Sequence, residues 1–298
     1  MASFKTFLIE IGESTKNSMG DTDAQKSADK AYTPKRVSID RFIEWCEKNA
    51  PKYLKNKGSD GIIYRGVSRT FPPLGIIDTD DFDRVSANTR NYYTLWIDNH
   101  EQWKKFPKRS KSLICTTSED TAVGYGNLCV VIPSDDSHLG LCPMDDIWYS
   151  IETRGLQLNE IVEEIYHLIT SNEGEEVAEA CQKDYSKLIS SLKKITLENI
   201  NKMRPAAFIR DFSWLMKAHG YESMYEAMEH IMDPLRSDFK QMKSGSYSMH
   251  RNTNREIWIQ GECAIIFIEE LEELSLQLRE FKKLKAFLSN HGIPHEYE

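Results

Sequence analysis

The sequence lacks an excess of positive charge, since 38 Lys and Arg residues stand against 46 Asp and Glu residues and the formal net charge is -8. This balance argues against bulk, sequence-independent attraction to nucleic acid or to an anionic membrane. No apolar run approaches the ~20 residues that cross a bilayer, so no membrane partner is expected. None of the six cysteines forms a Cys-x-x-Cys pair, which leaves zinc-ribbon and redox motifs without support. We therefore expect a reduced, cytoplasmic protein with no metal site and no secretory signal.

The 298 residues do supply enough apolar material for a substantial core. Hydrophobic residues make up 40% and charged residues 28%, as in soluble globular proteins and unlike disordered ones. Several cysteines lie in apolar, strand-like runs, where Cys is usually a small core residue. A local run of basic residues is predicted to be a solvated loop; it contains Lys104, Lys105, Lys108, Arg109 and Lys111.

The order of apolar patterns predicts an α+β fold. Strand-like runs cluster at about 60–70, 112–133 and 255–268, whereas about 156–243 shows the i, i+3, i+4 spacing of helices. Strands and helices do not alternate as they do in a doubly wound sheet. A helix is expected over 37–57, capped by Ser38 and ended by Gly58. We treat 36–298 as a single domain with a helical insertion at about 156–243.

Tyr64-Arg65-Gly66 ends an apolar strand that begins near Gly61. An arginine in this position can present its planar guanidinium to a phosphate, and the glycine allows the backbone to approach closely. The alternative is a surface arginine in an ordinary ion pair, and the motif alone favours that alternative.

Thr116-Thr117-Ser118 closes a second apolar strand. Hydroxyl groups at a strand end can hold a carboxylate and a sugar hydroxyl in fixed geometry. Because Ser followed by Glu-Asp is also a common helix start, Ser118 can alternatively be only the N-cap of a short helix over 119–125.

Two glutamates in the stretch NREIWIQGE compete for a catalytic role. Strand alternation places Glu256 and Trp258 on one face and Ile257 on the face toward the core. Glu256 then stands at the start of the strand beside a Gly/Ser-rich loop, whereas Glu262 follows Gly261, where the chain is expected to turn. A glutamate in a turn is usually solvated, so Glu256 is the better-placed acid.

Taken in order, these three motifs resemble those of the Arg-Ser-Glu class of mono-ADP-ribosyltransferases, relatives of the C3-like and binary bacterial toxins. The resemblance covers about 60–133 and 244–268. It implies an ADP-ribosyltransferase-like split β-sandwich flanked by helices, with NAD as the substrate. It also implies that Glu256, Arg65 and Thr116 are catalytic. The NAD-binding residues that it implies are Tyr64, Arg65, Gly66, Thr116, Thr117 and Ser118.

The implied reaction breaks the nicotinamide–ribose bond through an oxocarbenium-like state, in which Glu256 stabilises the positive charge and Arg65 orients the pyrophosphate. The acceptor would be a host protein or nucleic acid. Asn254, two residues before the glutamate, is neutral and cannot act as a base toward a guanidinium, which argues against arginine as the modified residue. Tyr247, in the loop SGSYSMHRNTN, is expected to contact the acceptor with Asn254; the alternative is that Tyr247 packs on the core.

The first ten residues, MASFKTFLIE, resemble the capsid-targeting leaders of internal head proteins of T-even-like bacteriophages. Those leaders end in an apolar-x-Glu site cut by the prohead protease, and Leu8-Ile9-Glu10 would be that site here. The resemblance implies packaging in the phage capsid, trimming after Glu10 and action in the host cytoplasm. Residues 11–35 are polar and are expected to form a flexible linker.

Two other functions compete with the transferase. A non-catalytic phage protein could retain the fold as a binding scaffold, because fold does not dictate function. Thr116, where the family usually has Ser, and the neutral Asn254 are compatible with that alternative. An NAD glycohydrolase would transfer the ribose to water.

Overall fold

The computed structural model describes residues 33–58, 61–67, 71–86, 89–153, 156–202, 207–248, 254–271 and 278–295. The predicted leader (1–10) and the predicted linker up to residue 32 lie outside the described residues. The last residues of that linker belong to the fold, because Pro34 is buried and Lys35 begins the first strand. The domain therefore starts slightly earlier than position 36.

The strands of the described chain are β1 (Lys35–Arg36), β2 (Ile63–Val67), β3 (Leu74–Asp78), β4 (Leu113–Thr116), β5 (Asn127–Pro133), β6 (His138–Leu141), β7 (Glu152–Thr153), β8 (Leu156–Gln157), β9 (Lys240–Lys243), β10 (Glu256–Gln260) and β11 (Glu262–Phe267). The helices before the insertion are α3 (Ile39–Asn49), α4 (Pro51–Asn56), α5 (Tyr92–Asn99), α6 (Glu119–Val123) and α7 (Ile147–Ser150). The later helices are α8 (Leu158–Glu173), α9 (Glu175–Cys181), α10 (Tyr185–Lys194), α11 (Leu197–Lys202), α12 (Ala207–His219), α13 (Met224–Ile231) and α14 (Leu278–Asn290). The 3₁₀ turns are η1 (Glu101–Trp103), η2 (Arg109–Lys111) and η3 (Ser244–Ser246).

A large antiparallel sheet organises these elements, so the predicted α+β class is confirmed. The described strands follow the order β1-β3-β11-β5-β2-β4-β10-β6-β9. β2 pairs with β5 over Ile63–Val67 but with β4 only at Tyr64, opposite Thr116. The sheet is therefore split into two halves that meet at this one pair.

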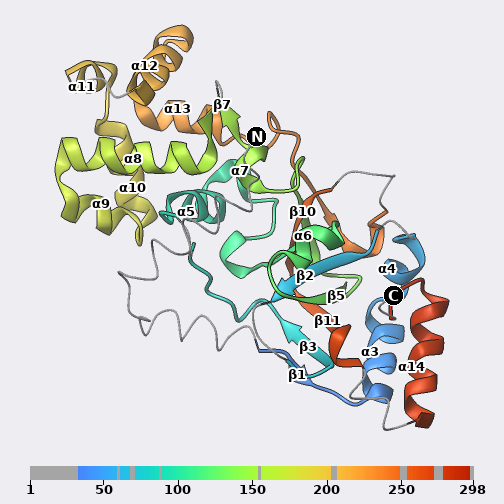
Figure 1. The fold of residues 1–298 in the computed structure, drawn as a ribbon. Helices are drawn as coiled ribbons and strands as arrows, with labels where there is room; N and C mark the ends of the chain where they lie inside the picture. The colour runs from blue at the N-terminus through green and yellow to red at the C-terminus, as the bar shows by residue number, and fades with distance from the viewer. Residues whose placement is uncertain are drawn as a thin grey trace.

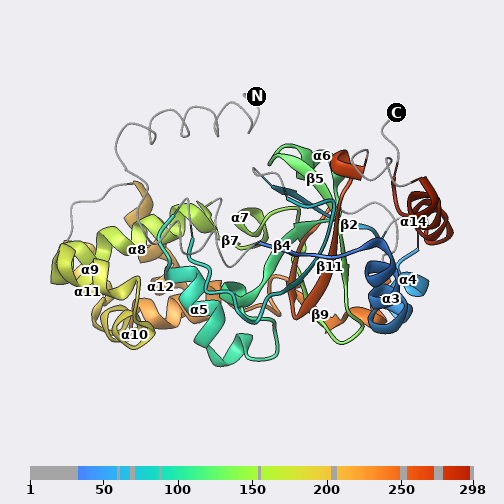
Figure 2. The ribbon, with the colours of Figure 1, turned by 90° about the horizontal axis from the view of Figure 1, so that it is seen from below.

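Each half of the sheet is covered by a different set of helices (Figure 2). The strands lie between α3, α4 and α14 on one side and the block α8–α13 on the other (Figures 1 and 2). The inner faces of the two halves share one buried cluster, which includes Leu113, Cys115 and Ile257 from one half and Val131 and Ile265 from the other. A second cluster joins α5 and η1 to the helical block.

β10 separates these two clusters, as its alternating sequence predicts. Ile257 and Ile259 belong to the first cluster, whereas Trp258 is fully buried in the second. After Gln260, Gly261 adopts φ +119 and the chain crosses to β11 in the other half of the sheet. The predicted turn between the two strands is confirmed, but the strands do not pair with each other.

The helical insertion interrupts two neighbouring strands, β6 and β9, which pair antiparallel from His138–Lys243 to Leu141–Lys240. The predicted range of 156–243 is wrong at its end, because Lys240–Lys243 extends the sheet. Six of the described strands were not predicted from the sequence, namely β3, β6 and β9 and the two-residue strands β1, β7 and β8. Ser38 caps α3 as predicted, accepting a hydrogen bond from the backbone N–H of Arg41.

Candidate active site

The split in the sheet brings together three residues that are far apart in the sequence. Tyr64 pairs with Thr116, and Thr116 pairs with Glu256 on the next strand. Side chains of directly opposed residues in antiparallel strands lie on the same face. Tyr64, Thr116 and Glu256 therefore form a row across β2, β4 and β10, which we call the junction row. The residues of the row are only 7–8% exposed.

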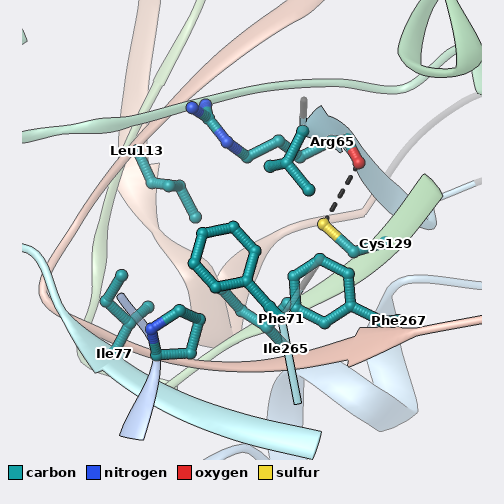
Figure 3. Close-up of a pocket in the computed structure, with 9 residues that line it drawn as sticks. Arg65, Phe71, Ile77, Leu113, Cys129, Ile265 and Phe267 are labelled. Carbon is teal, nitrogen blue, oxygen red and sulfur yellow. Dashed lines mark hydrogen bonds between the residues drawn. The ribbon is translucent and has the colours of Figure 1, made fainter. Parts of the chain in front are cut away.

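Arg65 lies on the opposite face of β2 from the junction row. Its Nη1 donates a hydrogen bond to the carbonyl of Ile114 in β4, across the split. Its stem lines an apolar pocket between the two halves of the sheet, where Phe71 and Phe267 pack at 5.3 Å between ring centroids (Figure 3). The cavity volume is about 40 Å³, which is room for a few water molecules, since one water occupies roughly 10–15 Å³ on this measure. The structure thus places the side chain of Arg65 on the opposite face of the sheet from the side chain of Glu256.

Gly66 is required by the helix that covers the junction row. A Cβ at this position would lie 1.9 Å from the carbonyl oxygen of Ala122 and 2.9 Å from the Cβ of Tyr125. The glycine therefore allows α6 to pack closely on β2. This packing explains the glycine in the described structure without the predicted close approach of the backbone to a phosphate.

Replacing Gly66 with alanine should destabilise the protein by about 1–3 kcal/mol, because the added methyl group overlaps backbone that cannot move freely. Gly124→Ala is a matched control: its φ is -60 and its nearest neighbour is 3.3 Å away. Urea denaturation should show a change of about 0.5 kcal/mol or less for the control. Equal stability of Gly66→Ala and wild type would contradict this packing.

The hydroxyl groups of Thr116-Thr117-Ser118 all accept hydrogen bonds from the backbone. Thr116 Oγ1 accepts from Ser118 N at 3.0 Å, and Thr117 Oγ1 accepts from Arg255 N at 3.0 Å. Ser118 Oγ accepts from Thr121 N at 3.2 Å and caps α6. Ser118 is therefore the N-cap of α6, which was the alternative prediction for this residue. Thr116 belongs to the junction row.

Glu256 is held by a buried ion pair. Its Oε1 lies 2.6 Å from Arg109 Nη1 and 2.5 Å from Trp258 Nε1, both of which donate hydrogen bonds to it. Its Oε2 accepts a longer bond, at 3.4 Å, from the backbone N–H of Ile147. Burial raises the pKa of Glu256, but the Arg109 charge and these hydrogen bonds outweigh burial and leave the pKa below its ordinary value. The carboxylate is therefore ionised at neutral pH, and Oε2 is the less engaged oxygen.

Arg109 was not predicted to take part in the site. The basic run that contains Arg109 was predicted to be a solvated loop, which is wrong for Arg109, because this residue is only 3% exposed. Its guanidinium lies over the rings of Trp258, at 4.8 Å, and Tyr93, at 5.4 Å. Such cation–π contacts add to the ion pair in fixing a buried arginine. Nothing in the local spacing of Lys108-Arg109-Ser110 distinguishes it from its solvated neighbours.

Asp146 is a second carboxyl group beside Glu256, and sequence analysis missed it too. It caps the short helix α7, where its Oδ1 accepts from Trp148 N at 3.0 Å. The next residue, Ile147, donates its N–H to Glu256. Burial, followed by the negative charge of Glu256, raises the pKa of Asp146 to about 7. Two neighbouring carboxyl groups with pKa values pushed apart are a common arrangement for acid–base chemistry.

Replacing Asp146 with asparagine should stabilise the protein at pH 8 and not at pH 4. The pKa of Asp146 rises from an ordinary 3.8 to about 7 on folding. Folding therefore favours the protonated form, so stability is lost as pH rises through this interval. Asparagine is an equally good N-cap without the charge, and the gain at pH 8 should be on the order of 1–3 kcal/mol.

Urea denaturation at both pH values measures this effect. The matched control is Asp184→Asn at the N-cap of α10, whose carboxylate accepts from Ser186 N and Lys187 N. The control should not gain stability at pH 8. Loss of stability by Asp146→Asn at pH 8 would contradict the account of this carboxyl group.

The residues predicted to contact the acceptor have different positions. Tyr247 is fully buried and stacks on Tyr53 at 6.0 Å between ring centroids. The prediction that it contacts the acceptor is wrong for this conformation, and the core-packing alternative is what the structure contains. Asn254 is exposed immediately before β10, and 249–253 lie outside the described residues. Glu262 is exposed at the start of β11, as expected of a residue outside the site.

No known protein family, no curated protein and no solved structure matches this chain. Within the described residues, no cluster of three or more His, Cys, Asp or Glu side chains could hold a metal ion. No helix in the same part of the chain is long and apolar enough to span a membrane. All six cysteines are buried and free.

Proposed function

We propose that the protein is an NAD-dependent mono-ADP-ribosyltransferase with an ADP-ribosyltransferase-like split β-sandwich. The observation that carries the proposal is the junction row, in which the Tyr-Arg-Gly strand, the Thr-Thr-Ser strand and the glutamate strand pair side by side at Tyr64, Thr116 and Glu256. The three motifs thus meet in space as well as in order along the chain. Glu256 stands among them as an ionised, preorganised carboxylate.

In the proposed reaction, Glu256 stabilises the positive charge that develops on the ribose as the bond to nicotinamide breaks. Arg109 and Trp258 hold Oε1, so that Oε2 is the oxygen available to the ribose. Thr116 lies opposite Glu256 and would position the ribose. Arg65 would take the pyrophosphate at the other side of the split, in place of its bond to the Ile114 carbonyl.

The acceptor in this proposal is a host macromolecule modified during phage infection. The leader resemblance of MASFKTFLIE supports packaging in the phage head, cleavage after Glu10 by the prohead protease, and release into the host cytoplasm. Mass spectrometry of the protein from purified virions tests this part separately: a mature N-terminus at Ile11 is expected, and a full-length virion protein would contradict it.

A scaffold without catalytic activity is the second candidate. Two observations favour it: Oε1 of Glu256 is already engaged by Arg109 and Trp258, and Arg65 lies on the far face of β2. The third candidate, an NAD glycohydrolase, would use the same carboxylate with water as acceptor.

Incubation of the purified protein with NAD labelled in its adenylate part, with and without host extract, separates the three. The transferase should attach label to a macromolecule only when extract is present. The glycohydrolase should release free ADP-ribose without extract, and the scaffold should leave NAD intact in both conditions. Intact NAD at every pH tested would reject the proposal.

A further inference from the structure

Three of the six large hydrophobic residues that are exposed in the described chain come from two segments beside the junction row. Val123, Tyr125 and Met144 are 51%, 54% and 49% exposed. Val123 and Tyr125 end the helical turn that covers β2, and Met144 follows β6. Exposed apolar side chains gathered at one place mark an interaction surface more often than a plain solvated one.

Met144 lies next to Glu256 in the structure. The carbonyl oxygen of Met144 accepts the backbone N–H of Glu256 at 2.9 Å. The negative charges of Asp146, Glu256 and Asp145 all act on the Tyr125 hydroxyl, and together with burial they raise its pKa. Tyr125 also lies against β2 beside the junction row, because a Cβ on Gly66 would come within 2.9 Å of the Tyr125 Cβ.

The surface around the three residues is acidic. Between Lys111 and Arg154 the sequence contains no Lys or Arg, and it contains Glu119, Asp120, Asp135, Asp136, Asp145, Asp146 and Glu152. Of these, Glu119, Asp120 and Asp145 are exposed next to the apolar residues in sequence. We call Val123, Tyr125, Met144, Glu119, Asp120 and Asp145 the acidic collar.

The nearby arginines do not reverse this charge. Arg109 is buried and paired with Glu256. Arg255 is half-buried and donates to the carbonyl of Cys142 at 3.3 Å. Arg84 acts on Glu256, where it lowers the carboxyl pKa. These three cations are buried or half-buried, whereas the collar carboxylates are exposed.

We infer that the acidic collar binds a basic protein segment that carries an apolar side chain. The collar repels the phosphates of a nucleic acid and attracts lysine and arginine, and Tyr125 and Met144 offer an apolar contact between the charges. That this segment accepts ADP-ribose rests on the proposed function. That the segment binds to the acidic collar does not depend on the proposed function. The inference moves acceptor contact from Tyr247 to Tyr125 and Met144.

Fluorescence anisotropy without NAD tests the inference on the full chain. The probes are a fluorescein-labelled lysine-rich peptide with a central leucine, the same peptide with glutamate for lysine, and labelled single-stranded DNA. The wild type should bind the lysine peptide most tightly, and more weakly as salt rises. Asp120→Lys with Asp145→Lys should weaken that binding about tenfold or more.

Three further variants serve as controls for this test. Glu44→Lys with Glu47→Lys makes the same charge change on exposed residues of α3, in the opposite layer, and should have little effect. Tyr125→Ser should weaken binding with no change in net charge. Asp120→Asn with Asp145→Asn replaces the lysine variant if that variant does not fold, and should weaken binding in the same direction.

Three results would overturn the inference: no binding of the lysine peptide by the wild type, equal weakening by the α3 variant, or tighter binding of DNA. If the inference is right but the proposed transferase function is wrong, the two assays give a different combination of results. In that case the collar variants still lose the peptide, but labelled NAD stays intact with the wild type.

Discussion

Replacing Glu256 with glutamine should reduce ADP-ribose transfer by about 10²–10³-fold, the range for losing one preorganised electrostatic contact with a transition state. Glutamine keeps an oxygen that can accept hydrogen bonds from Arg109 and Trp258, but it leaves the buried Arg109 without its counter-ion, so the variant should also be less stable than the wild type. It loses the negative charge that the oxocarbenium-like state needs. The initial rate of label transfer from NAD measures the effect.

Glu262→Gln is the matched control, because it makes the same change on an exposed residue at the start of β11. Its transfer rate should equal that of the wild type. If Glu262→Gln loses activity while Glu256→Gln retains it, the assignment of the catalytic acid is wrong.

Replacing Arg109 with methionine should destabilise the protein by about 3–5 kcal/mol, the usual effect of removing one partner from a buried ion pair. The buried Glu256 carboxylate would then lose its principal compensating charge, with the weaker effect of Arg84 remaining. Its pKa should rise above the unfolded value, so the loss of stability should be larger at pH 8 than at pH 5. Transfer activity should fall as well, because Glu256 would be largely protonated at neutral pH.

The double variant Arg109→Met with Glu256→Gln separates stability from chemistry. Removing both charges should recover much of the lost stability, since neither partner is left as an unpaired ion. Activity should not return, because the catalytic carboxylate is missing. Urea denaturation of the four proteins in this cycle gives the coupling energy. If Arg109→Met lowers the free energy of unfolding by less than about 1 kcal/mol, the pair is as weak as a surface ion pair. That result would contradict the stabilising role of the buried pair.

Sequence patterns predicted the elements whose signals are local. The Ser38 cap, the strands at β2, β4, β5, β10 and β11, and the turn at Gly261 follow from capping, alternation and glycine conformation. The strands β3, β6 and β9 were missed although β2, β4 and β10 are equally short, because β3 follows two prolines, β6 carries His138 and Gly140, and β9 (KQMK) is polar. At that length, pairing with neighbouring strands decides the structure more than the segment itself does.

The candidate site was only partly predictable for the same reason. The pairing of Tyr64, Thr116 and Glu256 agrees with the order of the motifs, although no local pattern fixes it. Arg109 and Asp146 reach Glu256 from η2 and from the turn before α7, and only tertiary structure reveals those contacts.

Two predicted roles changed because burial cannot be read from a loop's composition. Tyr247 stands in a Gly/Ser-rich segment but stacks on Tyr53 inside the core. Ser118 belongs to a hydroxyl run but serves as the cap of α6. The sequence allowed both outcomes as alternatives, namely core packing for Tyr247 and helix capping for Ser118. The structure shows these alternatives.

The central claim is that the junction row is where NAD reacts. A crystal structure with an unreactive NAD analogue tests it most directly. The account predicts the anomeric carbon of the nicotinamide ribose within about 3.5 Å of Glu256 Oε2, as near-attack geometry requires, with the pyrophosphate at Arg65. An analogue held instead among Phe71 and Phe267 with its ribose away from Glu256, or no bound analogue at saturating concentration, would contradict it.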